Sequence, residues 1–211
     1  MNRSLHVLPA LLLLAGMVAV LPGAATAQVV KEGNSSLDAL AFTSPRLNPN
    51  EDLESIDDVQ GLLSSDVSNG WASFRQSAGE WSALVDKRNG RVEVAEGNGI
   101  SWIPGRGNRL TQSIAPQAAG NGVGIDTLDT IARGFLPRVA VLLGVNPSNL
   151  VLNHGRSGMP ADYLAFVDYD VVLNDGTPIE GARVVFRVNH GNLIQFGAEN
   201  LPPMGIGQAK V

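Results

Sequence analysis

The chain has 211 residues, with 15 Lys and Arg against 20 Asp and Glu, and it contains no cysteine. The missing cysteine excludes disulfides, cysteine-based metal sites and cysteine nucleophiles, so packing must stabilise the fold. The sequence has no basic stripe of the kind that binds a phosphate backbone, and we expect no nucleic-acid partner.

The N-terminus has the order of a secretory signal peptide. Arg3 precedes an apolar run over residues 7–21, and small residues follow at 25–27. The run is shorter than the roughly 20 apolar residues that cross a bilayer. We expect residues 1–27 to be removed by cleavage between Ala27 and Gln28. The product would be secreted or periplasmic, with no membrane attachment.

Residues 28–67 have the composition of a flexible leader. The stretch 32–66 holds eight acids and a single base, and the segment is rich in Asn, Ser, Asp and Pro. One exception is 50–63, where Asn50 precedes apolar residues at helical spacing, although Gly61 disfavours a helix. We predict a largely flexible acidic leader that contains one short helix.

Residues 68–120 are predicted to form a smaller β-rich subdomain. Apolar and polar residues alternate over 81–85 and again over 92–94, on either side of Asn89-Gly90. An Asn-Gly pair between alternating segments is the strongest short hairpin signal. The subdomain also holds the three tryptophans, which form either a binding platform or, as we favour, part of a core. They are Trp71, Trp81 and Trp102.

The clearest helix of the chain is expected at the start of the segment 124–203. From Asp126 to Leu143 apolar residues recur at spacings of three and four, and Asp126 is the expected N-cap. Pro137 falls inside the pattern and is expected to kink the helix, and Gly144 is expected to end it.

The period then changes to two, which predicts an antiparallel meander of three strands, the last of them over 192–196. The first strand places Asp168 and Asp170 opposite an apolar face, and the second places Arg183 and Arg187 opposite another. The apolar faces contain Tyr163, Ala165, Val167, Tyr169, Val171 and Leu173, then Ala182, Val184, Phe186 and Val188. With the preceding helix, this unit is predicted to be α+β, a helix packed on a meander.

The order of these features resembles the propeptide module of secreted zinc metalloproteases of the fungalysin and thermolysin type, the FTP domain. The resemblance covers about 124–203, with residues 204–211 as a tail. Its most specific element is the sequence Gly-Thr-Pro-Ile-Glu-Gly-Ala at 176–182. The residues that carry the motif are structural: Asp175, Gly176, Pro178, Gly181, Ala182 and Gly191.

The resemblance implies a non-catalytic precursor segment that acts as folding template and inhibitor of its protease, in cis or in trans. A catalytic domain of that type needs a His-Glu-x-x-His motif, and the sequence contains none. In the family the chain would continue into the enzyme. The sequence is therefore interpreted as a fragment of a longer precursor or as a stand-alone protein. The alternative function is a free-standing secreted or periplasmic binding module with the same fold.

No catalytic, cofactor or metal residue is assigned from the sequence. His154 and His190 lie 36 positions apart, and we interpret both as ordinary turn or surface residues. The glycines around Ser157 do not have the spacing of the Gly-x-Ser-x-Gly elbow of serine hydrolases. The sequence around it also lacks the strand-turn-helix pattern that this motif requires. If the chain were an enzyme, its active site would have to be built from Asp, Glu and Arg alone. This is the hypothesis that we favour least.

The charged strand faces leave two alternatives open. Asp168, Asp170 and the nearby Asp175 supply oxygen ligands of the kind that Ca²⁺ prefers. Cross-strand pairing of the aspartates with Arg183 and Arg187 is the alternative, and we favour it. The resemblance adds that this charged face is a candidate surface for docking the protease.

Overall fold

The computed structural model describes residues 42–43, 47–110 and 123–202. The helices in this part are α2 (Pro49–Asp52), α3 (Ile56–Val59), η1 (Gln60–Leu62), α4 (Ser65–Ala78), α5 (Ile125–Leu143) and η3 (Pro147–Asn149). The strands are β1 (Phe42–Thr43), β2 (Leu53–Ser55), β3 (Trp81–Asp86), β4 (Arg91–Ser101), β5 (Leu150–Leu152), β6 (Gly158–Ala161), β7 (Leu164–Val172), β8 (Pro178–Asn189) and β9 (Asn192–Glu199). The predicted signal cleavage at Ala27 and Gln28 and the tail 204–211 lie outside the described residues.

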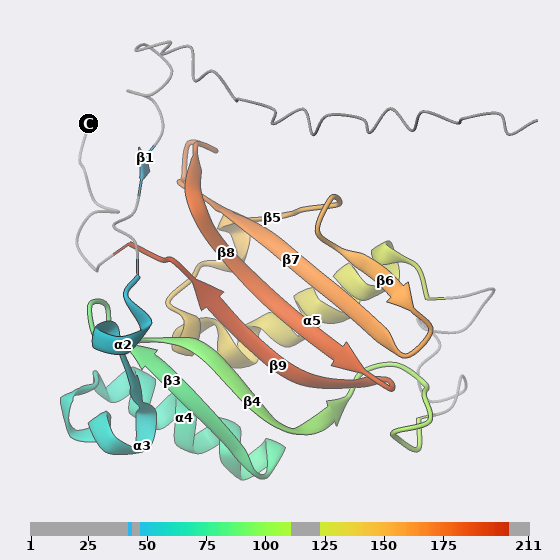
Figure 1. The fold of residues 1–211 in the computed structure, drawn as a ribbon, viewed down its shortest axis with the longest axis horizontal. Coiled ribbons are helices and arrows are strands. Elements are labelled where there is room, and N and C mark those ends of the chain that lie inside the picture. The colour runs from blue at the N-terminus through green and yellow to red at the C-terminus, as the bar shows by residue number, and fades with distance from the viewer. Residues whose placement is uncertain (1–41, 44–46, 111–122, 203–211) are drawn as a thin grey trace, which may run out of the picture. The chain divides into compact units, whose positions relative to one another are not determined.

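The strands form one sheet in the order β2-β3-β4-β9-β8-β7-β5, with β6 on β7 and β1 on β8 (Figure 1). Strands β2 to β9 pair antiparallel, whereas the two-residue β1 pairs parallel with β8. The predicted α+β class is confirmed, and so is the meander of β7, β8 and β9.

Helices α4 and α5 cover one face of the sheet. Their aromatic side chains meet those of the strands and of the loop after β4: the ring of Phe74 lies 5.2 Å from that of Phe196, and the ring of Phe135 lies 5.3 Å from that of Trp102. All three tryptophans are buried in this layer, so their prediction as core residues is confirmed. Large apolar surface is removed from water here, which is the dominant stabilising term.

Helix α5 begins and ends close to the predicted positions. The N-cap is Gly124 rather than Asp126. Asp126 lies in the first turn, where its negative charge interacts favourably with the positive end of the helix dipole. Gly144 has φ +68° and ends the helix as predicted. The helix continues through Pro137 as a single element.

The flexible leader predicted at 28–67 is wrong for its last part. Residues 47–67 are part of the folded structure, because β2 pairs with β3 at the sheet edge and Ile56 is fully buried. The single helix predicted at 50–63 is replaced by α2, β2, α3 and η1. Pairing with a neighbouring strand decides the conformation of Leu53–Ser55, and local spacing could not show it.

The boundary predicted between 67 and 68 is also wrong, because helix α4 runs across it. Ser64 caps this helix by accepting a hydrogen bond from the backbone N–H of Val67. The predicted separation of 68–120 from 124–203 does not hold either, since β4 pairs with β9 in one continuous sheet. The hairpin of β3 and β4 is confirmed, with a turn at 87–90 in which Gly90 has φ +67°.

Candidate functional site

The face of the sheet opposite α4 and α5 carries a network of charged side chains. In β7, Ala165, Val167 and Tyr169 point toward the helices and are buried, so the alternate residues Asp168 and Asp170 point to the other face. Strand β8 places Arg183 and Arg187 beside them. We call the six charged residues of this network the open-face network: Arg156, Asp168, Asp170, Arg183, Arg187 and Glu199.

Asp168 is the centre of the open-face network. Only 2% of this residue is exposed, and its carboxylate forms an ion pair with Arg187. The guanidinium nitrogens of Arg183 and Arg156 lie 3.6 Å and 3.8 Å from Asp168 Oδ2. Three cations therefore share one buried carboxylate, which lowers the cost of burying its charge.

The remaining members pair around this centre. Asp170 lies opposite Arg183 in the strand register, yet it pairs with Arg156 from the loop between β5 and β6. Arg183 instead donates to Glu199 Oε2 on β9, with a nitrogen–oxygen distance of 2.6 Å. Cross-strand pairing is confirmed for Asp168. The partner of Asp170 was missed, because periodicity within strands does not place a loop residue.

The open-face network holds three carboxylates and three guanidiniums, each engaged with an opposite charge. Asp175, the third proposed calcium ligand, lies in the exposed turn after β7, where its carboxylate accepts a hydrogen bond from Thr177 N. That hydrogen bond lowers the pKa of Asp175. Within the described residues, no three His, Cys, Asp or Glu side chains are grouped as a metal site.

The other residues of the 175–191 motif shape strand β8 and its two turns. Gly176 has φ +86°, Pro178 begins β8, and Gly181 has φ +78°. Ala182 is buried against the helix layer. Gly191 has φ +85°, and a Cβ there would lie 2.4 Å from the carbonyl oxygen of Ile103. Its lack of a side chain thus permits the loop after β4 to pack against the β8–β9 turn.

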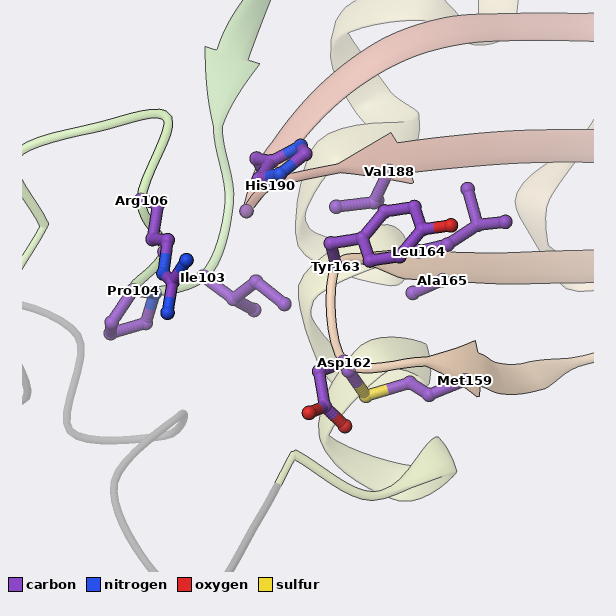
Figure 2. Close-up of a pocket in the computed structure, with 12 residues that line it drawn as sticks. Ile103, Pro104, Arg106, Met159, Asp162, Tyr163, Leu164, Ala165, Val188 and His190 are labelled. Carbon is purple, nitrogen blue, oxygen red and sulfur yellow. The ribbon is translucent and has the colours of Figure 1, made fainter.

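A separate pocket of about 320 Å³ lies at the end of the sheet where this turn meets the loop after β4 (Figure 2). Its apolar lining includes the buried side chains of Ile103, Ala165 and Val188. The full lining is Ile103, Pro104, Gly105, Arg106, Met159, Asp162, Tyr163, Leu164, Ala165, Val188, His190 and Gly191. The pocket leaves no pattern in the sequence, because its walls come from three separate segments.

Polar and aromatic side chains surround the apolar floor of this pocket. The rings of Tyr163 and His190 stack with their centroids 5.2 Å apart. Tyr163, predicted on the buried face of the strand, is 51% exposed because it lies in the turn just before β7. Arg106 and Asp162 are exposed at the pocket, and neither forms an ion pair within the described part of the chain.

A third feature, also missed from the sequence, is a buried acidic site at the start of β4. Glu93 is 8% exposed, and one of its carboxylate oxygens accepts a hydrogen bond from Asn200 N. Burial raises the pKa of Glu93 to about 7, helped by the nearby charges of Asp86 and Glu199. The fully buried Asp86 accepts hydrogen bonds from the side chain of Arg88.

The remaining residues singled out in the sequence are two histidines and a serine. His190 lines the pocket, and Ser157 is hydrogen-bonded to the backbone of Asp168. His154 is exposed in the loop after β5, and His190 occupies the turn between β8 and β9, as predicted for both. The hydroxyl of Ser157 accepts a hydrogen bond from Asp168 N and donates one to Asp168 O. Ser157 therefore fixes an edge loop to strand β7.

No family model, curated protein or solved structure matches this chain. Within the described residues, the helices are all too short or too polar to cross a membrane.

Proposed function

We propose that this chain is the non-catalytic propeptide region of a secreted zinc metalloprotease precursor. It would bind the catalytic domain as folding template and inhibitor through the open face of its sheet. The proposal combines the signal-like N-terminus and the family resemblance with one structural observation. That observation is a helix-backed sheet whose other face carries a fixed network of paired charges.

The rigidity of the open-face network supports a docking role. Asp168 is almost fully buried beneath three arginines, and the guanidinium of Arg187 also lies 4.9 Å from the ring of Phe166. Side chains held in this way lose little conformational freedom on binding, which reduces the entropic cost of association. Their alternating charges also favour one orientation of a complementary partner.

The first test measures inhibition. The purified protein is titrated against a panel of thermolysin-like metalloproteases while residual peptidase activity is recorded. Stoichiometric inhibition that disappears as the chain is digested is the expected result. If no member of the panel is inhibited at any ratio, the propeptide proposal fails.

A matched pair of variants then tests the docking face. Gln195 lies on the open face beside Arg187 and Glu96, whereas Asn69 is exposed on helix α4 in the opposite layer. Gln195→Trp should weaken inhibition more than about tenfold, since a bulky side chain prevents close approach at a packed interface. Asn69→Trp should leave inhibition unchanged. Equal effects of the two variants would show that the open face is not the docking surface.

The alternative is a free-standing secreted or periplasmic binding module. The pocket at the end of the sheet favours it, because apolar cavities with a few polar groups are the usual form of ligand sites. A protein of this kind would inhibit no protease, and Gln195→Trp would leave its ligand binding unchanged.

A further inference from the structure

We propose that the pocket beside the β8–β9 turn binds a short free peptide, with an apolar side chain in the cavity, its carboxylate at Arg106 and its ammonium group at Asp162. This inference goes beyond the proposed propeptide function, because the pocket and the open-face network share no residue. Its failure would therefore leave that function untouched.

The unpaired charges at the pocket carry the argument. On the open face, every arginine of the network engages a carboxylate, and Arg75 and Arg133 also form ion pairs, whereas the exposed Arg109 and Arg138 form none within the described residues. Arg106 forms none within the described residues, although the acid Asp162 lines the same cavity. Figure 2 shows the two side chains on separate walls, Arg106 on the loop after β4 and Asp162 on the turn before β7.

Two opposite charges on separate walls select a ligand that carries both charges with a spacer between them. An anion alone would engage only Arg106, and a cation alone would engage only Asp162. A peptide with free ends has this arrangement, and both of its charges gain charge-assisted hydrogen bonds. The small volume of about 320 Å³ limits the ligand to a few residues.

The walls between the charges fit a peptide as well. Ile103, Ala165 and Val188 form an apolar floor that suits an aliphatic side chain. The stacked rings of Tyr163 and His190 add a flat wall with a hydroxyl and an imidazole, which can hydrogen bond to peptide groups. Two of the walls are also tied to each other, because Trp102 N and Ile103 N, in the loop after β4, both donate to Gly191 O in the β8–β9 turn.

The test is an NMR titration of the full chain with the tripeptide Ala-Leu-Ala, following the amide resonances of Ala165 and Gly191. The matched probe is the same tripeptide with an acetylated N-terminus and an amidated C-terminus. The free peptide should saturate one site, and the blocked peptide should bind at least about tenfold more weakly, because both charge-assisted contacts are lost.

Variants then assign the two charges. Arg106→Gln and Asp162→Asn should each weaken binding of the free peptide at least about fivefold. Arg109→Gln in the same loop and Asp58→Asn on α3 are matched controls that lie outside the pocket lining and should bind normally. Met159→Trp, which fills the cavity from β6, should abolish binding while circular dichroism stays unchanged.

The proposal is overturned if the free peptide shows no saturable binding to the folded protein. It is equally overturned if free and blocked peptides bind alike, or if Arg109→Gln weakens binding as much as Arg106→Gln. Inhibition of a metalloprotease is measured separately, so failure here is distinguishable from failure of the propeptide function.

Discussion

Glu93 makes the stability of this fold depend on pH in an unusual direction. Most paired carboxylates stabilise a protein as they ionise, whereas burial raises the pKa of Glu93 from 4.5 to about 7. The folded state therefore binds this proton more tightly than the unfolded state. Between pH 4.5 and about 7, its contribution to stability falls as the pH rises, and it is constant outside that window.

Replacing Glu93 with Gln should remove this dependence. The amide keeps an oxygen that accepts from Asn200 N and carries no charge to bury. We expect Glu93→Gln to match the parent at pH 4 and to exceed its free energy of unfolding by about 2 to 3 kcal/mol at pH 8. Urea denaturation across this pH range measures the difference. Glu96→Gln, at an exposed position on the same strand, is the control, and an identical pH profile for all three proteins would contradict the argument.

Asp168 should matter more for stability than an exposed acid with one partner. Asp168→Asn leaves Arg183 and Arg187 partly buried without their shared carboxylate, which should cost about 2 to 4 kcal/mol. Asp57→Asn breaks an ion pair with Arg75 whose side chains are 54% and 43% exposed, and it should cost less than about 1 kcal/mol. Chemical denaturation of both variants compares the two losses. Equal losses would show that burial of Asp168 is unimportant.

At the scale of elements, helix α5 contains a glycine that limits its stability. Gly134 lies in the helix interior, and beyond the local helix backbone and its chain neighbours a Cβ there would meet no atom within 4 Å. Gly134→Ala should therefore raise the free energy of unfolding by about 0.5 to 1 kcal/mol through helix propensity alone.

Gly144, at the end of the same helix, should respond to alanine in the opposite direction. It has φ +68°, and a Cβ would lie 2.8 Å from the side chain of Arg91. Gly144→Ala should destabilise the protein, because alanine resists the left-handed conformation. Thermal unfolding of the two variants should shift in opposite directions. Shifts of the same sign would contradict the assigned end of α5.

Sequence periodicity correctly predicted the elements that bury one regular face against the core. The alternation in β7 and β8 correctly gave both faces of the meander, and the three- and four-residue spacing gave α5. Helix α4 was missed although Val67, Trp71 and Phe74 lie four and three apart, because Ser, Asn and Gly around them favour turns. Strand β2 has too few residues to show a period, and only its pairing with β3 defines it.

Only those residues of the candidate site that lie within strands could be predicted from the sequence. Asp168 and its cross-strand arginines were visible in the alternation of β7 and β8, whereas Arg156 belongs to a loop whose position no local pattern gives. The pocket joins the loop after β4 to a turn more than 50 residues later, and Glu93 accepts a hydrogen bond from Asn200, which follows β9. Features of this kind depend on long-range contacts, which a single sequence does not reveal.

At the scale of the molecule, the N-terminal and C-terminal halves of the described structure complete one core. Strand β4 pairs with β9, and Arg91 on β4 donates to the carbonyl oxygen of Val141 in α5 over a distance of 2.8 Å. The ring of Phe135 contacts Phe74 and Trp102 from the first half as well as Phe186 and Phe196 from the second. Helix α5 of the C-terminal half is thus covered in part by aromatic side chains of the N-terminal half.

The segment 124–203, which the sequence presented as a domain, should therefore not fold alone. Without β4 it exposes the edge of β9, and without α4 it exposes the Phe135 face of α5 to water. We expect the isolated segment to lack a cooperative thermal transition, and the full chain to unfold in a single step with equal calorimetric and van't Hoff enthalpies. Calorimetry of the full chain and circular dichroism of the segment test both statements. A cooperative transition of the isolated segment would show that the meander and α5 are sufficient by themselves, and that the first half packs on a core that is already complete.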